Sequence, residues 1–382
     1  MDFNLSEEQI AFRDVVRRWV NEELPKDLMR KLEADEENYP FEIWDKLKAQ
    51  GFFGVGIPEE WGGLGGDVVT QMIFAREMAR TAGGLLWVWG LTSFGGAKTI
   101  GAVGSDEQKE RWLRPMAAGD LRVSLSMTEP DGGTDVLGAM KTFAEKVDGG
   151  WKLNGAKMWI SNSPKADIAV VWAKNEAGEI VGLIVERGMA GFTTPTIHDK
   201  WSLRASATGE LVFDHVRVPK QNILPNIKGL KGPLSCLSKA RYGIAWGALG
   251  AAMDCYFTAL KYSQERIQFG KPIGAFQLQQ KKLAEMITEI TKAQLMVWRI
   301  GVLMNEDRAT PQQISMAKRN SCEMATNIVR DARQILGGMG ITGEFSIMRH
   351  MMNLESVITY EGTHDIHLLI TGMDITGFNA FK

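Results

Sequence analysis

The feature that most constrains the fold is a double change of sequence pattern along the 382 residues. Apolar residues recur at helical spacing up to about residue 122, fall into short strand-like runs between turn residues from about Val123, and return to long helical runs near residue 231. We therefore predict an α+β, mainly α fold. Its expected parts are an N-terminal helical domain (1–122), a middle β-barrel-like domain (123–232) and a C-terminal helical bundle (233–382).

Local signals give these regions their elements. Ser6 can cap a first helix in a box with Gln9, and Pro25 closes or interrupts that helix. In the middle region, NEAG at 175–178 predicts a hairpin loop between two strands of a small, mainly antiparallel sheet. The last region contains patterned runs at 235–266, 275–305 and 311–336, lengths typical of antiparallel helices in a bundle.

Charge and cysteine usage exclude several classes of protein. The chain has 44 Lys and Arg against 46 Asp and Glu, a near balance that gives no electrostatic reason to expect a nucleic-acid partner. Cys236, Cys255 and Cys322 stand in none of the paired spacings of zinc or thiol redox sites, which favours a reducing, cytoplasmic setting. The acidic start predicts no signal peptide, and we expect no membrane span.

Two motifs suggest chemistry that their context does not favour. GMGITG at 338–343 matches the dinucleotide-binding G-x-G-x-x-G pattern, but it follows a helical run instead of a strand. It can end a helix or accept a ligand close to its backbone. The five histidines form no H-E-x-x-H motif, and for His364 and His367 capping or surface roles are favoured over zinc ligation. An enzyme built from this chain would therefore need a cofactor as its electrophile, and we expect no metal.

One carboxylate is the best candidate for a catalytic base. Glu361 follows a largely apolar run and precedes a probable helix start, where apolar neighbours can raise the pKa of a carboxyl toward the working pH. The alternative is an acid of the first helical turn, favoured by the helix dipole. Residue chemistry alone favours this alternative.

Five motifs in order and spacing resemble those of the acyl-CoA dehydrogenase flavoproteins. They are MTEP at 127–130, WISN at 159–162, RIQFG at 266–270, QILGG at 334–338 and YEGT at 360–363. The resemblance covers essentially the whole chain. SLRASATG at 202–209, ARYGIAWG at 240–247 and YEGTHDIH at 360–367 are similar to the glutaryl-CoA dehydrogenase branch.

The resemblance implies the acyl-CoA dehydrogenase fold, with a four-helix bundle in its C-terminal part, and an FAD cofactor. Glu361 would remove the α-proton of an acyl-CoA thioester while the β-hydride passes to FAD. The backbone N–H of Glu361 and a ribityl hydroxyl of the flavin would polarise the thioester carbonyl. The implied partners are an electron-transfer flavoprotein and further copies of the chain in a homotetramer.

The resemblance also carries residue roles. Side chains expected near the flavin ring are Met127, Thr128, Trp159, Ser161, Thr363 and Asp365. Those expected at its adenosine and pyrophosphate, partly from a neighbouring subunit, are Arg266, Phe269, Gln277, Gln334, Gly337 and Gly338. Residues expected at the acyl-CoA are Gly132, Arg241, Tyr360 and Gly362. Taken singly, Trp159 could be plain core, Arg266 a solvated helix residue and Thr363 a helix N-cap.

The chain departs from the glutaryl-CoA branch at two expected substrate positions. Leu86 stands where that branch has an arginine for the distal carboxylate, and Gly90 stands where it has a serine. Leucine cannot neutralise a carboxylate, so we predict a bulky, apolar acyl group: branched, alicyclic or aryl. Alternatively, the nearby tryptophans pack away from the pocket. Competing functions are a glutaryl-CoA-type decarboxylating dehydrogenase, a flavin oxidase or monooxygenase on the same fold, and a helical scaffold without chemistry.

Overall fold

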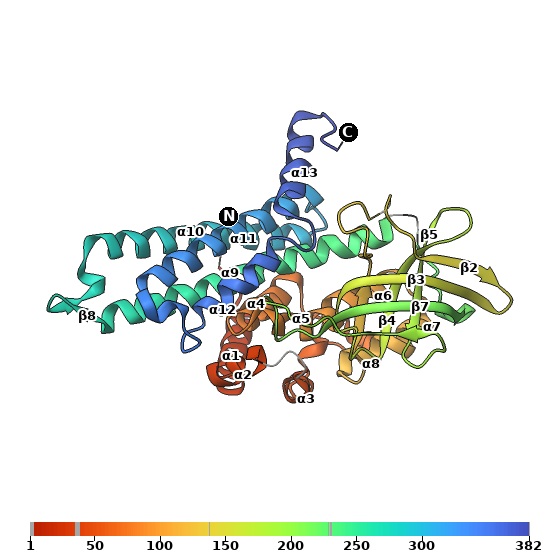
Figure 1. Ribbon diagram of the computed structural model, residues 1–382, viewed down its shortest axis with the longest axis horizontal. Coiled ribbons are helices and arrows are strands. Elements are labelled where there is room, and N and C mark those ends of the chain that lie inside the picture. Colours follow the sequence, from red (N-terminus) through yellow and green to blue (C-terminus); the bar gives the residue numbers. More distant parts are fainter. Residues whose placement is uncertain (1–3, 35–38, 137, 228, 230, 382) are drawn as a thin grey trace.

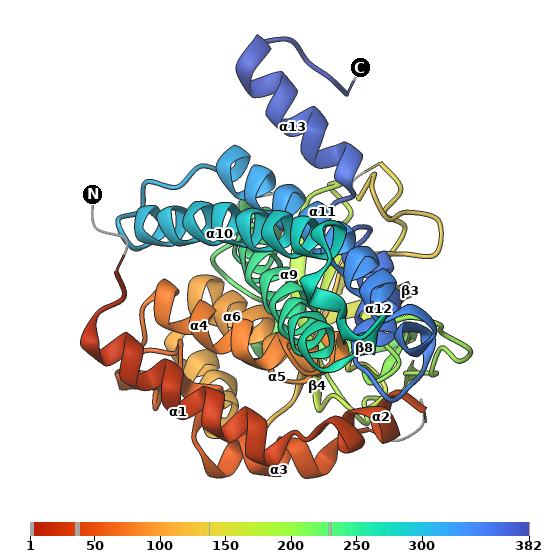
Figure 2. The ribbon, with the colours of Figure 1, turned by 90° about the vertical axis from the view of Figure 1, so that its left-hand side faces the viewer.

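The computed structural model describes residues 4–34, 39–136, 138–227, 229 and 231–381. It is elongated, with a helical bundle at one end and a β-sheet at the other, while the N-terminal helices pack along both (Figures 1 and 2). This arrangement confirms the predicted α+β, mainly α class. The domain boundaries themselves stay a prediction.

The N-terminal region is a set of helices, one of which is almost fully buried. α4 (Val68–Ala79) is capped by Asp67, whose carboxylate accepts from the N–H of Thr70, and nearly all of its residues are buried. The predicted capping box of Ser6 and Gln9 is confirmed at the start of the first helix. The other elements are α1 (Glu7–Glu23), α2 (Lys26–Ala34), α3 (Phe41–Ala49), α5 (Gly83–Gly90), η3 (Leu91–Gly96), α6 (Ala97–Val103), α7 (Asp106–Gln108), η4 (Lys109–Leu113) and α8 (Arg114–Ala118).

The middle region is a seven-stranded sheet in the order β1-β4-β2-β3-β7-β6, with β5 paired to β4. Its pairs are antiparallel except β1–β4 and the short β2–β4 contact, and the 175–178 hairpin joins β4 to β5 as predicted. β4 is buried on both faces because one face packs on N-terminal helices and the other on the curled sheet itself. The strands are β1 (Val123–Ser126), β2 (Phe143–Val147), β3 (Gly150–Ser161), β4 (Ile168–Lys174), β5 (Ile180–Glu186), β6 (Phe192–Thr193) and β7 (Thr208–Pro219).

Long helices form the C-terminal bundle. α9 (Lys231–Glu265), α10 (Gln277–Asn305), α11 (Pro311–Ile335) and α12 (Ile347–Val357) pack around one another, and α4 packs against α9 and α10. A small hairpin, β8 (Ile267–Gln268) and β9 (Lys271–Pro272), joins α9 to α10 at the far end of the bundle (Figure 1). The glycine-rich run that resembles a dinucleotide loop follows α11 and forms the short helix η7 (Gly337–Ile341). Its helical context is therefore confirmed.

One hydrophobic core unites the first and last regions. It runs from Val16 and Trp19 through Met72 and Trp89 to residues of α9, α11 and α12. Because the N-terminal and C-terminal helices share this core, their contact surface is rigid enough to hold a shaped pocket.

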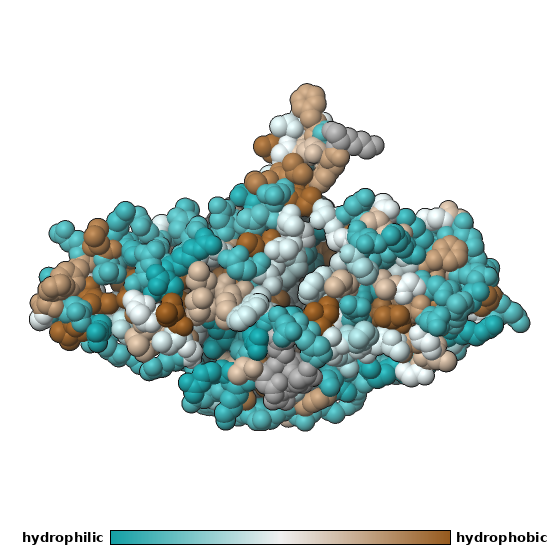
Figure 3. Space-filling model, viewed as in Figure 1, coloured by the Kyte–Doolittle hydropathy of each residue, from teal (hydrophilic) through white to brown (hydrophobic). Residues whose placement is uncertain are grey.

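The last helix, α13 (His364–Thr376), leaves this core and projects from the body (Figures 1 and 2). Apolar side chains are exposed along it and in the segment that follows, and they give the projection its hydrophobic surface in Figure 3: Leu368, Leu369, Ile375, Phe378 and Phe381. Within the described residues, no helix combines the length and the apolar character needed to span a bilayer. The same residues contain no cluster of three or more potential metal ligands.

Candidate active site

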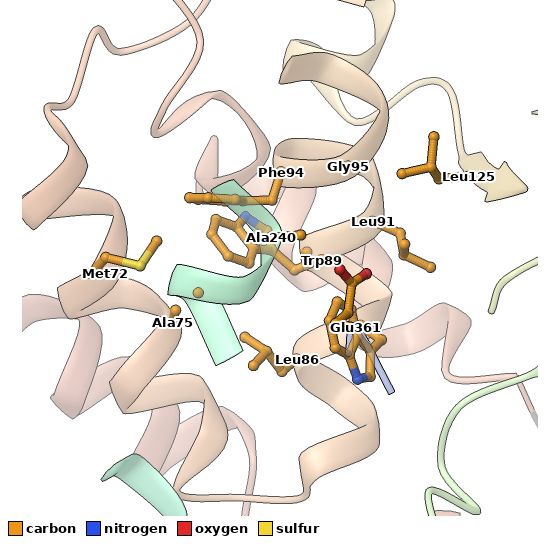
Figure 4. A pocket seen from close by; sticks show the side chains of 13 residues that line it. Met72, Ala75, Leu86, Trp89, Leu91, Phe94, Gly95, Leu125, Ala240 and Glu361 are labelled. Atoms are coloured by element: carbon orange, nitrogen blue, oxygen red, sulfur yellow. The ribbon is translucent and has the colours of Figure 1, made fainter. Parts of the chain in front are cut away.

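A pocket lies where α4, α5 and η3 meet α9 and the loop before α13. Its empty space, with the open solvent at its mouth included, is about 440 Å³. η3 is a π-helical turn, a distortion that recurs at functional sites. The lining is apolar except for one carboxylate, and Figure 4 labels ten of its thirteen residues. The thirteen are Met72, Ala75, Leu86, Trp87, Trp89, Gly90, Leu91, Phe94, Gly95, Leu125, Ala240, Gly243 and Glu361.

That carboxylate is Glu361, and its position decides between the two interpretations of this acid. It lies ahead of Thr363, the N-cap of α13, so it is not an acid of the first helical turn. Its side chain points into the pocket (Figure 4), and its Oε2 is buried without a hydrogen-bond partner among the described residues. Burial raises the pKa of Glu361, while Arg241 and Lys318 oppose the shift. A base of this kind can accept a proton nearer neutral pH than an exposed glutamate.

The backbone around Glu361 is held in an unusual conformation. Glu361 has a φ of 56°, a left-handed value that costs a non-glycine residue about 1 kcal/mol or more. Two cationic side chains stabilise the loop: Arg241 Nε donates to the carbonyl of Glu361 at 2.7 Å, and Lys318 Nζ donates to the carbonyls of Tyr360 and Gly362 at 2.6 Å each. The structure thus brings Arg241, Tyr360 and Gly362 together beside the candidate base.

The two positions that depart from the glutaryl-CoA branch both line the pocket. Leu86 shares the lining with Glu361, and a Cβ added to Gly90 would meet only Trp87 at 3.8 Å, so the glycine leaves open space. The tryptophans divide between the two alternatives. Trp87 lines the pocket and contacts Tyr360, whereas Trp89 touches the pocket but is a core residue whose Nε1 donates to the carbonyl of Phe52.

The residues expected at the flavin ring form a second group at the edge of the sheet. The N–H of Met158 donates to the carbonyl of Thr128 at 3.0 Å, which places the segments of Met127 and Trp159 side by side. Trp159 is 56% exposed and has a φ of 61° at a bulge between β3 and β7, so the plain-core alternative is wrong. An exposed indole held by a strained backbone is a surface on which a planar ring can stack. Ser161 ends β3 just beyond it and is partly buried.

A buried ion pair supports this edge. Lys157 Nζ lies 2.8 Å from Glu129 Oε1 and donates to the carbonyl of Met127 at 3.1 Å, and Lys157 is fully buried. Glu129 also accepts from the N–H groups of Lys141 and Thr142. Gly132 pairs with Glu129 through the backbone, in a turn where an added Cβ would meet Ala139 at 2.4 Å.

At the start of α13 the outcome is mixed. Thr363 is the helix N-cap, because its hydroxyl accepts from the N–H of Ile366 at 3.2 Å. The capping alternative for Thr363 is therefore confirmed, and its role at a flavin stays a prediction. Asp365 follows in the first turn and is exposed.

The residues expected at the adenosine lie at the other end of the bundle. Gln334 is 16 residues beyond Lys318 on α11, or about 24 Å at the rise of an α-helix. Arg266 and Phe269 lie at the β8–β9 hairpin, where Phe269 is 92% exposed. Added Cβ atoms at Gly337 and Gly338 would meet nothing within 4 Å, so this backbone is open to a close ligand. The set is exposed and surrounds the ends of α10 and α11: Arg266, Phe269, Gln277, Gln334, Gly337 and Gly338.

Sequence reasoning missed Lys318 and much of the pocket wall. A lysine within a patterned helix is normally solvated, and only the buried position of Lys318 on α11 shows that it reaches the loop. Met72 and Phe94 belong to no motif, and they line the pocket because α4 and η3 meet there.

Comparisons with known proteins match every region of the chain. Residues 6–120, 124–216 and 228–376 match the N-terminal, middle and C-terminal domains of acyl-CoA dehydrogenase. A short-chain specific acyl-CoA dehydrogenase of Megasphaera elsdenii is 33% identical, over 97% of this chain and 99% of its own. Subunit CarC of the caffeyl-CoA reductase–Etf complex of Acetobacterium woodii is 32% identical, over 96% and 98%.

A solved structure extends this similarity to the fold. Glutaryl-CoA dehydrogenase from Mycobacterium smegmatis in complex with FADH2 superposes with a TM-score of 0.95 at 39% identity, covering 99% of this chain and 97% of that one. The chain therefore belongs to the acyl-CoA dehydrogenase family, FAD-dependent oxidoreductases that act on CH–CH groups.

Proposed function

We propose that this protein is an FAD-dependent dehydrogenase that converts an acyl-CoA thioester to its α,β-enoyl-CoA. The observation that carries the proposal is the Glu361 carboxylate, the one charged group in the lining of an apolar pocket. FAD, when bound, would supply the acceptor for the substrate β-hydride. Trp159 and Thr128 would hold its ring, and the exposed group around Gly337 and Phe269 would hold its adenosine end.

Within this reaction the chain's own residues move one proton and stabilise one developing charge. Glu361 accepts the α-proton on a carboxylate whose pKa is raised by burial, so its affinity for the proton is increased. The backbone N–H of Glu361 would donate to the thioester oxygen as negative charge builds there. Arg241 holds the carbonyl of Glu361 and so keeps the loop in place. The apolar wall excludes water from the reacting carbons.

The pocket wall supports a bulky apolar acyl group. Leu86 and Leu91 offer apolar surface and Gly90 leaves room, while the lining contains no cation that could pair with a second carboxylate. Burying an unpaired carboxylate costs several kcal/mol. Branched, alicyclic or aryl acyl-CoA thioesters therefore fit better than glutaryl-CoA, despite the similarity to glutaryl-CoA dehydrogenases.

The remaining parts of the proposal concern partners and setting. One predicted flavin-binding group lies at the edge of the sheet and the other at the far end of the helical bundle, which supports an oligomer such as the expected homotetramer, in which one copy completes the site of another. A relative that is a subunit of an Etf complex supports an electron-transfer flavoprotein as acceptor. Cys255 and Cys322 are buried free thiols, as expected for a cytoplasmic protein.

Anaerobic titration of the purified flavoprotein tests reaction and substrate together. The flavin should bleach with cyclohexanoyl-, isovaleryl- or phenylpropionyl-CoA and remain oxidised with glutaryl-CoA at equal concentration. Efficient turnover of glutaryl-CoA at low concentration, with release of CO₂, would favour the decarboxylating alternative. Rapid reoxidation of the reduced flavin by air in stopped flow would favour an oxidase, and a colourless protein would favour a scaffold without chemistry.

A further inference from the structure

Lys318 is a buried cation bonded to backbone carbonyls. It is fully buried at a position well inside α11, and none of the ion pairs among the described residues includes it. Its ammonium instead donates to the carbonyl oxygens of Tyr360 and Gly362 at 2.6 Å each and lies 5.8 Å from the centre of the Tyr360 ring. A buried charge without a counter-ion is costly, and a neutral residue would fill this space at lower cost.

The bound carbonyls belong to the residues on both sides of the candidate base. With Arg241 on the carbonyl of Glu361, three successive carbonyls are held by two cationic side chains. No peptide bond among the described residues is cis. In a planar trans peptide the carbonyl of one residue and the N–H of the next point in opposite directions, so fixing the Tyr360 carbonyl also fixes the Glu361 N–H.

The Glu361 N–H is itself available. None of the hydrogen bonds found in the described part of the chain uses it as a donor. The left-handed φ of Glu361 shows that the peptide is held away from its preferred geometry. Lys318 holds this loop from α11, which packs against α9 over much of its length. A helix fixed in this way can maintain the strained geometry of the loop.

We propose that Lys318 is a positioning residue of this active site: by binding the Tyr360 and Gly362 carbonyls, it aims the Glu361 N–H at the substrate thioester oxygen. This inference rests on the proposed function, since it assigns a role within the same reaction. Lys318 would not touch the substrate. Its effect should therefore depend on whether the ligand has a carbonyl oxygen.

A matched pair of ligands isolates that effect. Cyclohexanoyl-CoA carries the thioester carbonyl, and S-(cyclohexylmethyl)-CoA replaces the carbonyl with a methylene group. Binding is measured by calorimetry in a Glu361→Gln background, which prevents turnover and removes the charge through which Lys318 could act on the base. The background protein should prefer the thioester. Adding Lys318→Met should reduce that preference about three- to tenfold, the worth of one hydrogen bond.

Two further variants separate positioning from folding. Arg319→Met removes the neighbouring cation on α11, which pairs with Glu323 at 3.3 Å, and should leave the preference unchanged. Lys318→Gln keeps an uncharged N–H donor group and should give an intermediate preference. This variant provides the test if Lys318→Met does not fold. With Glu361 intact, Lys318→Met should slow flavin reduction about 10²-fold, as loss of one oxyanion donor does.

The outcomes are distinct. An undiminished thioester preference in the folded Lys318 variants would overturn the positioning role while the proposed function stands. A background protein that binds neither CoA ligand would contradict the proposed function itself, and the inference with it.

Discussion

The indole N–H of Trp87 donates to the hydroxyl of Tyr360 at 3.2 Å, and their rings meet edge to face at 5.3 Å. Trp87 belongs to α5 in the pocket wall, whereas Tyr360 precedes the candidate base, so the pair joins the substrate wall to the catalytic loop. Both residues are fixed by an aromatic contact as well as by the hydrogen bond.

Trp87→Phe should keep the ring contact and lose the hydrogen bond. We expect kcat/KM to fall about three- to tenfold, the worth of about 1 kcal/mol, with little change in melting temperature. Trp201→Phe is the control, because Trp201 is 80% exposed and should tolerate the same change. Equal kinetics for the two variants would show that the Trp87–Tyr360 bond does not serve catalysis.

Gly90→Val should narrow the pocket without disturbing the core. An added Cβ has room, with Trp87 at 3.8 Å, so the variant should fold, but its methyl groups would occupy acyl space. We expect kcat/KM for cyclohexanoyl-CoA to fall about 10- to 100-fold more than that for butyryl-CoA. The control is Gly101→Val, at an exposed site on α6, which should affect kcat/KM for both substrates equally. An equal fall in kcat/KM for cyclohexanoyl-CoA and butyryl-CoA in Gly90→Val would show that the acyl group does not lie beside Gly90.

Glu361→Gln should stabilise the protein increasingly as pH rises. Burial raises the pKa of Glu361 above 4.5, so the folded state holds this proton more tightly than the unfolded chain does. The contribution of the Glu361 carboxyl to folding stability is thus greatest below pH 4.5, and it is lost as pH rises through the pKa of Glu361 in the folded protein. Calorimetry from pH 4 to 8 should show the melting-temperature gain of the variant growing by about 2 °C or more. A pH-independent difference would contradict the raised pKa.

Lys157→Met should destabilise the edge of the sheet that carries Thr128 and Trp159. It would leave the Glu129 carboxylate, which is 5% exposed, without its counter-ion, at a cost of about 3–5 kcal/mol. Pairing holds the pKa of Glu129 below its usual range, so the wild-type advantage should shrink as pH falls through that lowered value. Denaturant unfolding of Lys157→Met and of Lys157→Met/Glu129→Gln checks this. The double variant should recover part of the loss, and additive losses would exclude the coupling.

Much of the architecture follows from the sequence because local signals agree with it. The capping box at Ser6, the hairpin at 175–178 and the long helical runs all appear in the structure. These features depend on neighbouring residues, which a single sequence displays. Trp159 differs, because its exposure comes from a bulge between paired strands, a tertiary feature.

The candidate site could be predicted only in part. Glu361 was identified through the motif around it, whereas its unpartnered carboxylate depends on helices distant in sequence. Lys318 could not be recognised at all, since its role arises from a contact across 42 residues to the Tyr360 carbonyl. Sequence pattern thus predicts the reaction class, and long-range packing determines how the loop is held.

The most direct test of the central claim is exchange of the substrate α-proton for deuterium. Wild-type protein incubated anaerobically in D₂O with cyclohexanoyl-CoA should label the α-carbon, as followed by mass spectrometry. Glu361→Gln should bind flavin and ligand with unchanged affinity yet lose exchange by about 10²-fold or more. Exchange at the wild-type rate in a folded, flavin-loaded Glu361→Gln protein would show that another group is the base.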